Sequence, residues 1–227
     1  MHMAGQKKST APRAYSMGRR REQLESMRQR ITEAAFELHA TVGPAQTSIS
    51  AVAERAGVQR HTVYHHFPDM TSLMQACTAH GMRTTGVPDA ASWVAIEDPT
   101  ARLRHGLGEL YGYYAANARL LGNVVRDAPL MADIGGAEEF AEHMTGLFYA
   151  LAGGWADAPA TQRLRMAAIG HAMAFETWRS LTGNGLSDVE ACGLMVGLVT
   201  TVGAEPARRP ARSAARPAPR PCSRSRP

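Results

Sequence analysis

Seven side chains that can hydrogen-bond to a nucleic-acid duplex lie within eight consecutive residues of this chain. Gln and Arg side chains can pair with the edges of adenine and guanine, and Thr, Tyr and His side chains can reach phosphate oxygens. On a helix, Val63 and Phe67 would pack inward and leave the other side chains facing outward. The stretch favours a DNA-reading helix, although an exposed helical hairpin without a ligand also fits it. The seven residues are Gln59, Arg60, His61, Thr62, Tyr64, His65 and His66.

The residues around this stretch predict the short helix and tight turn of a helix-turn-helix. Ser48 is a good N-cap for a helix over 49–56. Gly57 accepts the positive φ of a sharp turn, because it has no Cβ to clash with the backbone. The DNA-reading helix is expected over 59–67, and Pro68 ends it.

Helices are predicted along most of the rest of the chain, which indicates an all-α fold of about nine helices. Apolar residues at three- and four-residue steps predict a long first helix from Leu24 to Val42, and Asp69 caps a fourth that reaches about Thr84. Residues 85–98 are expected to be irregular. Five further helices are predicted over 100–117, 119–127, 137–155, 160–181 and 187–203.

The histidines and carboxylates suggest neither a metal site nor catalysis. His61 and His65 share a helix face, but no Glu lies between them as in a His-Glu-x-x-His site, and no thiolate is near in sequence. Glu139 and His143 are also four residues apart, where an exposed polar face is the simpler interpretation. Phosphate-binding loops, nucleophile elbows and paired-Cys motifs are absent from the sequence. We therefore expect no enzyme activity, no metal and no cofactor.

Charge is unevenly distributed along the 227 residues. Residues 1–70 carry a net +4, residues 71–204 a net −5 and residues 205–227 a net +6. A basic N-terminal third on an acidic middle part suggests that only the first part meets a polyanion. Three widely spaced cysteines form no disulfide framework, and no apolar run suits a signal peptide or a membrane span. We expect a cytoplasmic protein that does not enter a membrane.

The stretch from Ile31 to Leu73 resembles the DNA-binding domain of the TetR (tetracycline repressor) family of bacterial regulators. The family is specified by the combination of motifs and by none of them alone. The matching pieces are Ile31-Thr-Glu-Ala-Ala-Phe-Glu-Leu38, Gly43, Thr47-Ser48, Val52-Ala53, Ala56-Gly57-Val58, Thr62-Val63-Tyr64-His65-His66-Phe67 and Leu73.

The resemblance assigns roles to individual residues of this chain. It implies that Ser48 caps the second helix and contacts phosphate, and that Ser50 lies on the outward face of that helix. It also implies that residues 60–62 face bases or backbone, and that Tyr64 and His66 bind phosphates. Met70 departs from the pattern, since the family often has a phosphate-binding Lys there, and this leaves one backbone contact in doubt. The arginines at 19–21 form a basic arm, which offers an alternative contact to an adjacent minor groove or to the backbone.

Four segments follow from the pattern and the resemblance together. Residues 1–20 are expected to form a disordered basic arm, and 21–68 a three-helix DNA-binding domain. Residues 69–204 are expected to form a helical ligand-binding and dimerisation domain. The Arg/Pro/Ala-rich residues 205–227 are expected to be a disordered tail.

By resemblance, the middle helices enclose a mostly apolar pocket for a small molecule. The last two helices would join two copies into a homodimer. The function implied is a repressor that a small-molecule effector releases from a palindromic operator in double-stranded DNA. The alternative is a helical small-molecule binding protein or enzyme with a vestigial DNA-binding head. The candidate pocket residues are Met82, Trp93, Tyr111, Tyr114, Phe140, His143, Met144 and Trp178.

Overall fold

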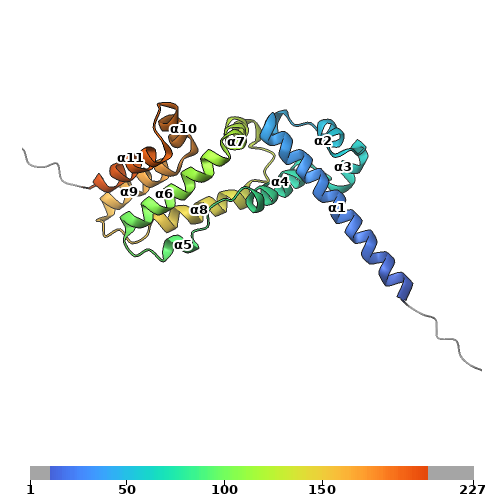
Figure 1. Cartoon of the computed structure of the whole chain (residues 1–227), viewed down its shortest axis with the longest axis horizontal. Coiled ribbons are helices and arrows are strands. Elements are labelled where there is room, and N and C mark those ends of the chain that lie inside the picture. The colour runs from blue at the N-terminus through green and yellow to red at the C-terminus, as the bar shows by residue number, and fades with distance from the viewer. Residues whose placement is uncertain (1–10, 204–227) are drawn as a thin grey trace, which may run out of the picture.

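The computed structural model describes residues 11–203, and within them the chain is helical with no strand. The expected all-α fold is confirmed, with eleven α-helices in the described part where about nine were expected (Figure 1). Residues 1–10 of the predicted arm and the predicted tail 205–227 lie outside the described residues. The elements are α1 (Ala11–Thr41), the 3₁₀ turn η1 (Pro44–Gln46), α2 (Ile49–Ala56), α3 (Arg60–His66), α4 (Met70–Thr84), α5 (Ala91–Val94), α6 (Pro99–Ala116), α7 (Ala118–Met131), α8 (Glu138–Ala152), α9 (Pro159–Met173), α10 (Phe175–Gly183) and α11 (Asp188–Thr201).

Two separate hydrophobic cores divide the described chain. One core joins α1, α2 and α3, which we call the head, and the other joins α5 to α11, which we call the body. Helix α4 runs between them in Figure 1. Its residues Leu73 and Cys77 are buried in the core of the head, so this core continues beyond residue 68. None of the described helices is long and apolar enough to cross a membrane.

The first helix begins earlier than the sequence suggests. Residues 11–20, which the sequence assigns to a basic arm, belong to α1 in the structure. Arg, Glu and Gln are good helix formers, and extending a helix that is already packed adds one hydrogen bond per ordered residue. Arg21 and Glu25 also form an i,i+4 ion pair of 3.6 Å. The arginines at 19–21 therefore lie on a helix that projects beyond the head (Figure 1).

The single helix expected over 160–181 is two helices, α9 and α10, separated at Ala174. The Tyr111 hydroxyl donates to the carbonyl of Ala172 at 2.8 Å, and the Tyr114 hydroxyl donates to that of Met173. These carbonyls would otherwise accept bonds from the next helical turn. Ala174 takes an extended conformation (φ −66°, ψ 132°), so the chain changes direction there.

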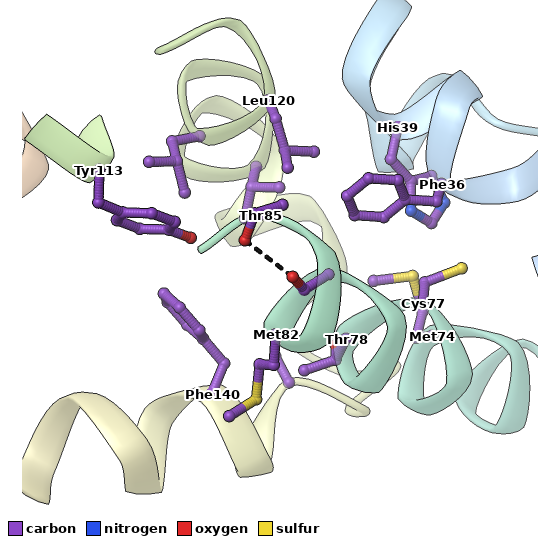
Figure 2. A pocket seen from close by; sticks show the side chains of 14 residues that line it. Phe36, His39, Met74, Cys77, Thr78, Met82, Thr85, Tyr113, Leu120 and Phe140 are labelled. Atoms are coloured by element: carbon purple, nitrogen blue, oxygen red, sulfur yellow. Dashed lines mark hydrogen bonds between the residues drawn. The ribbon is translucent and has the colours of Figure 1, made fainter. Parts of the chain in front are cut away.

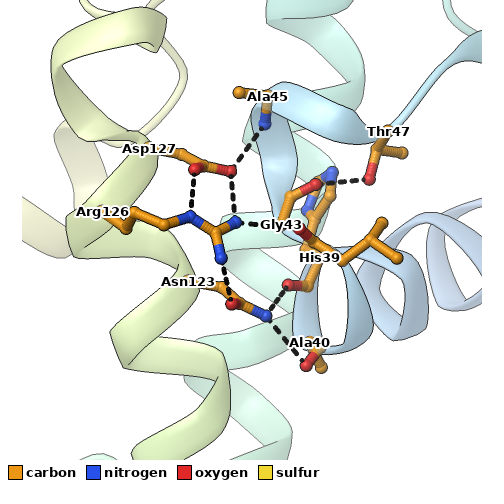
Figure 3. Close-up of polar contacts among 9 residues, drawn as sticks. His39, Ala40, Gly43, Ala45, Thr47, Asn123, Arg126 and Asp127 are labelled. Atoms are coloured by element: carbon orange, nitrogen blue, oxygen red, sulfur yellow. Dashed lines mark hydrogen bonds and ion pairs between the residues drawn. The ribbon is translucent and has the colours of Figure 1, made fainter.

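Side chains of α7 hold the C-terminus of α1 against the body (Figure 3). The Asn123 amide donates to the carbonyls of His39 and Ala40 at 3.2 and 3.1 Å, and Arg126 donates to that of Val42 at 2.8 Å. The last carbonyls of a helix have no partner within the helix and carry its negative dipole end, so donors and cations stabilise them. Arg126 also pairs at 2.7 Å with the buried Asp127.

Candidate nucleic-acid interface and effector cavity

The turn between α2 and α3 is built by local contacts that the sequence predicts. The Ser48 hydroxyl caps α2 by accepting from the amide of Ala51 at 3.2 Å. Gly57 ends α2 with a φ of +65°, which a side chain would strain. Arg30 of α1 donates to the carbonyl of Ala56 at 2.6 Å and so fixes the turn to the first helix.

Helix α3 packs inward through two residues and presents its other side to solvent. Val63 and Phe67 are no more than 1% exposed, as their four-residue spacing predicts. Among the predicted DNA contacts, Thr62 and His66 are half-buried. The others lie exposed on α3 and at the start of α2: Ser48, Ser50, Gln59, Arg60, His61, Tyr64 and His65. The fold thus leaves all nine at the surface of the head, and their role in DNA binding stays a prediction.

Arg28 of α1, which the sequence analysis did not single out, holds the end of α3. Its guanidinium donates to the carbonyl of His66 at 2.5 Å and lies 4.1 Å from the centre of the Phe67 ring. Partial burial, followed by the neighbouring charges of His65 and Arg28, lowers the pKa of His66. A neutral His66 can donate a hydrogen bond to a phosphate without contributing a charge. Among the nine predicted contacts, Arg60 is the single arginine.

A cavity of about 110 Å³ lies where α1 and α4 meet the body (Figure 2). Two of the predicted pocket residues, Met82 and Phe140, line it. Tyr113 lines it, whereas the predicted Tyr111 and Tyr114 do not, and their hydroxyls donate to the carbonyls of Ala172 and Met173 in α9. The complete lining is Phe36, His39, Met74, Cys77, Thr78, Gly81, Met82, Thr85, Tyr113, Leu120, Leu121, Val124, Ala137 and Phe140.

The other predicted pocket residues lie outside this cavity. Trp93 is fully buried and its indole donates to Glu109 at 2.6 Å, while the indole of Trp178 donates to Asp188 at 2.8 Å. A ring nitrogen of His143 lies 2.7 Å from the carbonyl of Pro88. Met144 lines a separate shallow hollow between α8 and α9.

Two lining residues that sequence reasoning missed, Phe36 and His39, belong to α1. The pattern assigned α1 to the head, and nothing in it indicates that the last turns of α1 also face the body. His39 is 4% exposed. Burial lowers its pKa to about 4, although the charge of Asp127 opposes this shift. His39 is therefore a neutral group at pH 7.

Comparison with known proteins gives one family match and several relatives. Residues 31–77 match the family described as "Bacterial regulatory proteins, tetR family". The HTH-type transcriptional regulator BetI of Yersinia pestis (strain Pestoides F) is 34% identical over 79 residues, which are 34% of this chain and 40% of BetI. The regulator SrpR of Pseudomonas putida is 34% identical over 80 residues, 33% of this chain and 38% of SrpR. The chain thus matches about 40% of the length of these curated relatives.

Solved structures extend the likeness to most of the described fold. A TetR-like transcriptional regulator from Rhodococcus sp. RHA1 superposes with a TM-score of 0.55 at 19% identity, covering 77% of this chain and 94% of that one. NalD of Pseudomonas aeruginosa, the secondary repressor of the MexAB-OprM multidrug efflux pump, gives a TM-score of 0.52 at 19% identity, covering 79% and 96%. At such identities the likeness establishes the arrangement of head and body.

Proposed function

Since the chain belongs to the tetR family of bacterial regulatory proteins, we propose that it is a DNA-binding transcriptional regulator. In this proposal it is a repressor that leaves a palindromic operator when a mostly apolar small molecule binds. The observation that carries the proposal is the exposed surface of α3, which gathers Arg60 and its polar neighbours on a buried, well-capped scaffold. The proposal includes no catalytic activity, and it places the protein in the cytoplasm with its DNA.

The predicted DNA contacts fit the geometry of a major-groove reader. The side chains at the start of α3 would face base edges, and Ser48, Tyr64 and His66 would bind phosphates on either side. In a two-fold dimer, the two copies of α3 would enter successive major grooves about 34 Å apart. A palindromic operator follows from that symmetry.

Fluorescence anisotropy with a labelled duplex tests this function. The duplex is taken from the region upstream of the gene, or is selected by the full-length protein from a pool of random sequences. We expect saturable binding of two protomers per duplex and clear preference over a scrambled duplex at two salt concentrations. Binding equal to that of every scrambled duplex would contradict the proposal. A chain that binds small molecules but no specific duplex would instead support a helical binding protein with a vestigial head.

The surface of α11 supports the proposed homodimer through the last two helices. One side of α11 packs into the core of the body through Ala191, Met195 and Val199. Its other side is exposed and mostly apolar: Val189 is 81%, Leu194 44% and Leu198 53% exposed, with Glu190 as the charged residue of the first turn. This side also includes Gly193 and Gly197, where an added Cβ would meet no atom within 4 Å. Small residues in an apolar stripe allow close helix packing, so a second copy of α11 would cover it.

Leu198→Glu should convert the dimer into a monomer, because each dimer would bury two carboxylates in an apolar interface without partners. We expect the dimer dissociation constant to rise by at least about a hundredfold, and duplex binding to weaken with it. Sedimentation velocity at several concentrations measures this change. Val94→Glu is the matched control, because Val94 is 61% exposed on α5. An unchanged dimer in Leu198→Glu would place the interface elsewhere.

A further inference from the structure

The cavity described above lies at a junction, with walls from both the head and the body. Phe36 and His39 reach it from α1, and Leu120, Leu121 and Val124 reach it from α7 (Figure 2). Helix α4 supplies a third wall, and its hydroxyls Thr71 and Thr78 bond to the carbonyls of Ile134 and Gly136, ahead of α8. A molecule bound there would touch the head and the body at once.

The size of the cavity suits a very small molecule. Its volume is about 110 Å³, and an apolar cavity of about 150 Å³ in another protein binds benzene. The thioether side chains of Met74 and Met82 line the cavity, and Met adapts its shape more readily than branched residues do. The junction cavity is smaller than the one that binds benzene, so a single aromatic ring is the largest group that fits with the walls as they stand. A small substituent on the ring requires Met74 or Met82 to change its rotamer.

The lining carries no charge at neutral pH. Burial lowers the pKa of His39 to about 4, raises that of Cys77 to about 12 and raises that of Tyr113. The charges of Arg126 and Asp127 are paired with each other beside the end of α1. An ionised ligand would leave water without meeting a counter-charge in the lining, so the cavity favours a neutral ligand.

We propose that this junction cavity binds a neutral molecule the size of one aromatic ring, and that this molecule is the effector. The second part rests on the proposed function as a regulator. The polar side chains in the lining that can orient such a ligand are Tyr113, His39, Thr78 and Thr85. The two threonine hydroxyls already donate to the carbonyls of Gly136 and Gly81, so toward a ligand they act as acceptors. A ligand with one hydroxyl or carbonyl group on an aromatic ring matches this set.

The position of the cavity also gives the effector a direct route to the head. Helix α7 lines the cavity with Leu120, Leu121 and Val124, and the same helix holds the end of α1 through Asn123 and Arg126. A ligand that enlarges the space between α1 and α7 would favour a different orientation of the head. The ligand lowers DNA affinity if the protein binds it more tightly with the head in this orientation than with the head in its DNA-bound orientation.

The first test compares benzyl alcohol with benzoate on the full chain without DNA. The two probes share the ring and nearly the same size but differ in charge at pH 7. We expect one benzyl alcohol site per protomer in isothermal titration calorimetry, and benzoate binding at least about tenfold weaker. Equal affinities, tighter benzoate binding, or no binding of benzyl alcohol would overturn the proposal.

Two substitutions at one lining residue locate the site. Cys77→Met fills part of the cavity and should weaken benzyl alcohol binding at least about tenfold. Cys77→Ala enlarges the cavity and should raise the affinity for 2-phenylethanol severalfold relative to that for benzyl alcohol. This second variant keeps the test valid even if Cys77→Met unfolds. Cys192→Ala is the control, because Cys192 is a buried thiol on α11 outside the cavity. If neither Cys77 variant changes the affinity for benzyl alcohol or 2-phenylethanol, the ligand does not bind in the junction cavity and the proposal is wrong.

The DNA assay separates this inference from the proposed function. Benzyl alcohol should lower the affinity of the chain for its selected duplex, and Cys77→Met should reduce that effect. A chain that binds benzyl alcohol in the cavity but selects no duplex would refute the regulator and leave the ligand site standing. A chain that selects a duplex but binds neither probe would refute only the junction site.

Discussion

Arg60→Glu should abolish sequence-specific DNA binding while leaving the fold and the binding of benzyl alcohol unchanged. Arg60 is exposed at the start of α3 and no described core contact depends on it. A bidentate Arg contact to a base contributes about 1–3 kcal/mol of discrimination, and a two-fold dimer would lose two of them. The new carboxylate would also repel phosphates. We expect specific affinity to fall by at least about a hundredfold in fluorescence anisotropy.

Arg83→Glu provides a control with the same change of charge. Arg83 is exposed in the last turn of α4, outside α3 and outside the helices proposed to form the dimer. If both reversals weakened DNA binding equally, the effect would come from net charge alone. If Arg60→Glu bound the specific duplex as tightly as the wild type does, another face of the protein would read DNA.

Acid should destabilise this protein between pH 6.5 and pH 4 because His39 stays neutral in the folded state. The pKa of His39 is lowered to about 4 by burial, against about 6.5 in the unfolded chain. The unfolded state therefore binds a proton in this window that the folded state does not, so stability is complete above pH 6.5 and falls as the pH drops. The loss by pH 4 should be about 2–3 kcal/mol.

Urea unfolding at pH 7, 5.5 and 4.5 measures this loss in the wild type and in His39→Leu. The slope of stability against pH should be shallower in the variant. His105→Leu is the control, since His105 is partly exposed beside Glu109 on α6. Asp127 acts at lower pH, because its bond from Arg126 lowers its pKa and its contribution is lost only as the carboxylate protonates. Parallel curves for wild type and His39→Leu would contradict the assignment to His39.

The elements of the head follow from the sequence because their signals are local. The N-cap Ser48, the turn at Gly57 and the cap at Asp69 each act on residues a few positions away, and α2 begins and ends as predicted. The outward face of α3 follows from the four-residue spacing of Val63 and Phe67. Helical periodicity alone settles which side chains are buried there.

The cavity depends on contacts that no local pattern contains. Tyr111, Tyr113 and Tyr114 are all buried on α6, but only Tyr113 lines the cavity. One step along a helix turns a side chain by about 100°, and a helix with aromatic residues on several sides does not indicate which side faces a ligand. Docking against α9, where the other two hydroxyls bond to backbone carbonyls, decides the orientation.

The sequence by itself determined the all-α class, the helix-turn-helix of the head and which side chains of α3 are exposed, because capping, turn geometry and periodicity operate within a few residues. Only the tertiary structure decided the break at Ala174 and the contribution of Phe36 and His39 to the cavity. Both depend on partners about 60 residues or more away in the chain, such as Tyr111 with Ala172 and Asn123 with His39. Packing of the whole body brings such partners together. This packing reduces both the exposed apolar surface and the number of unpaired backbone groups.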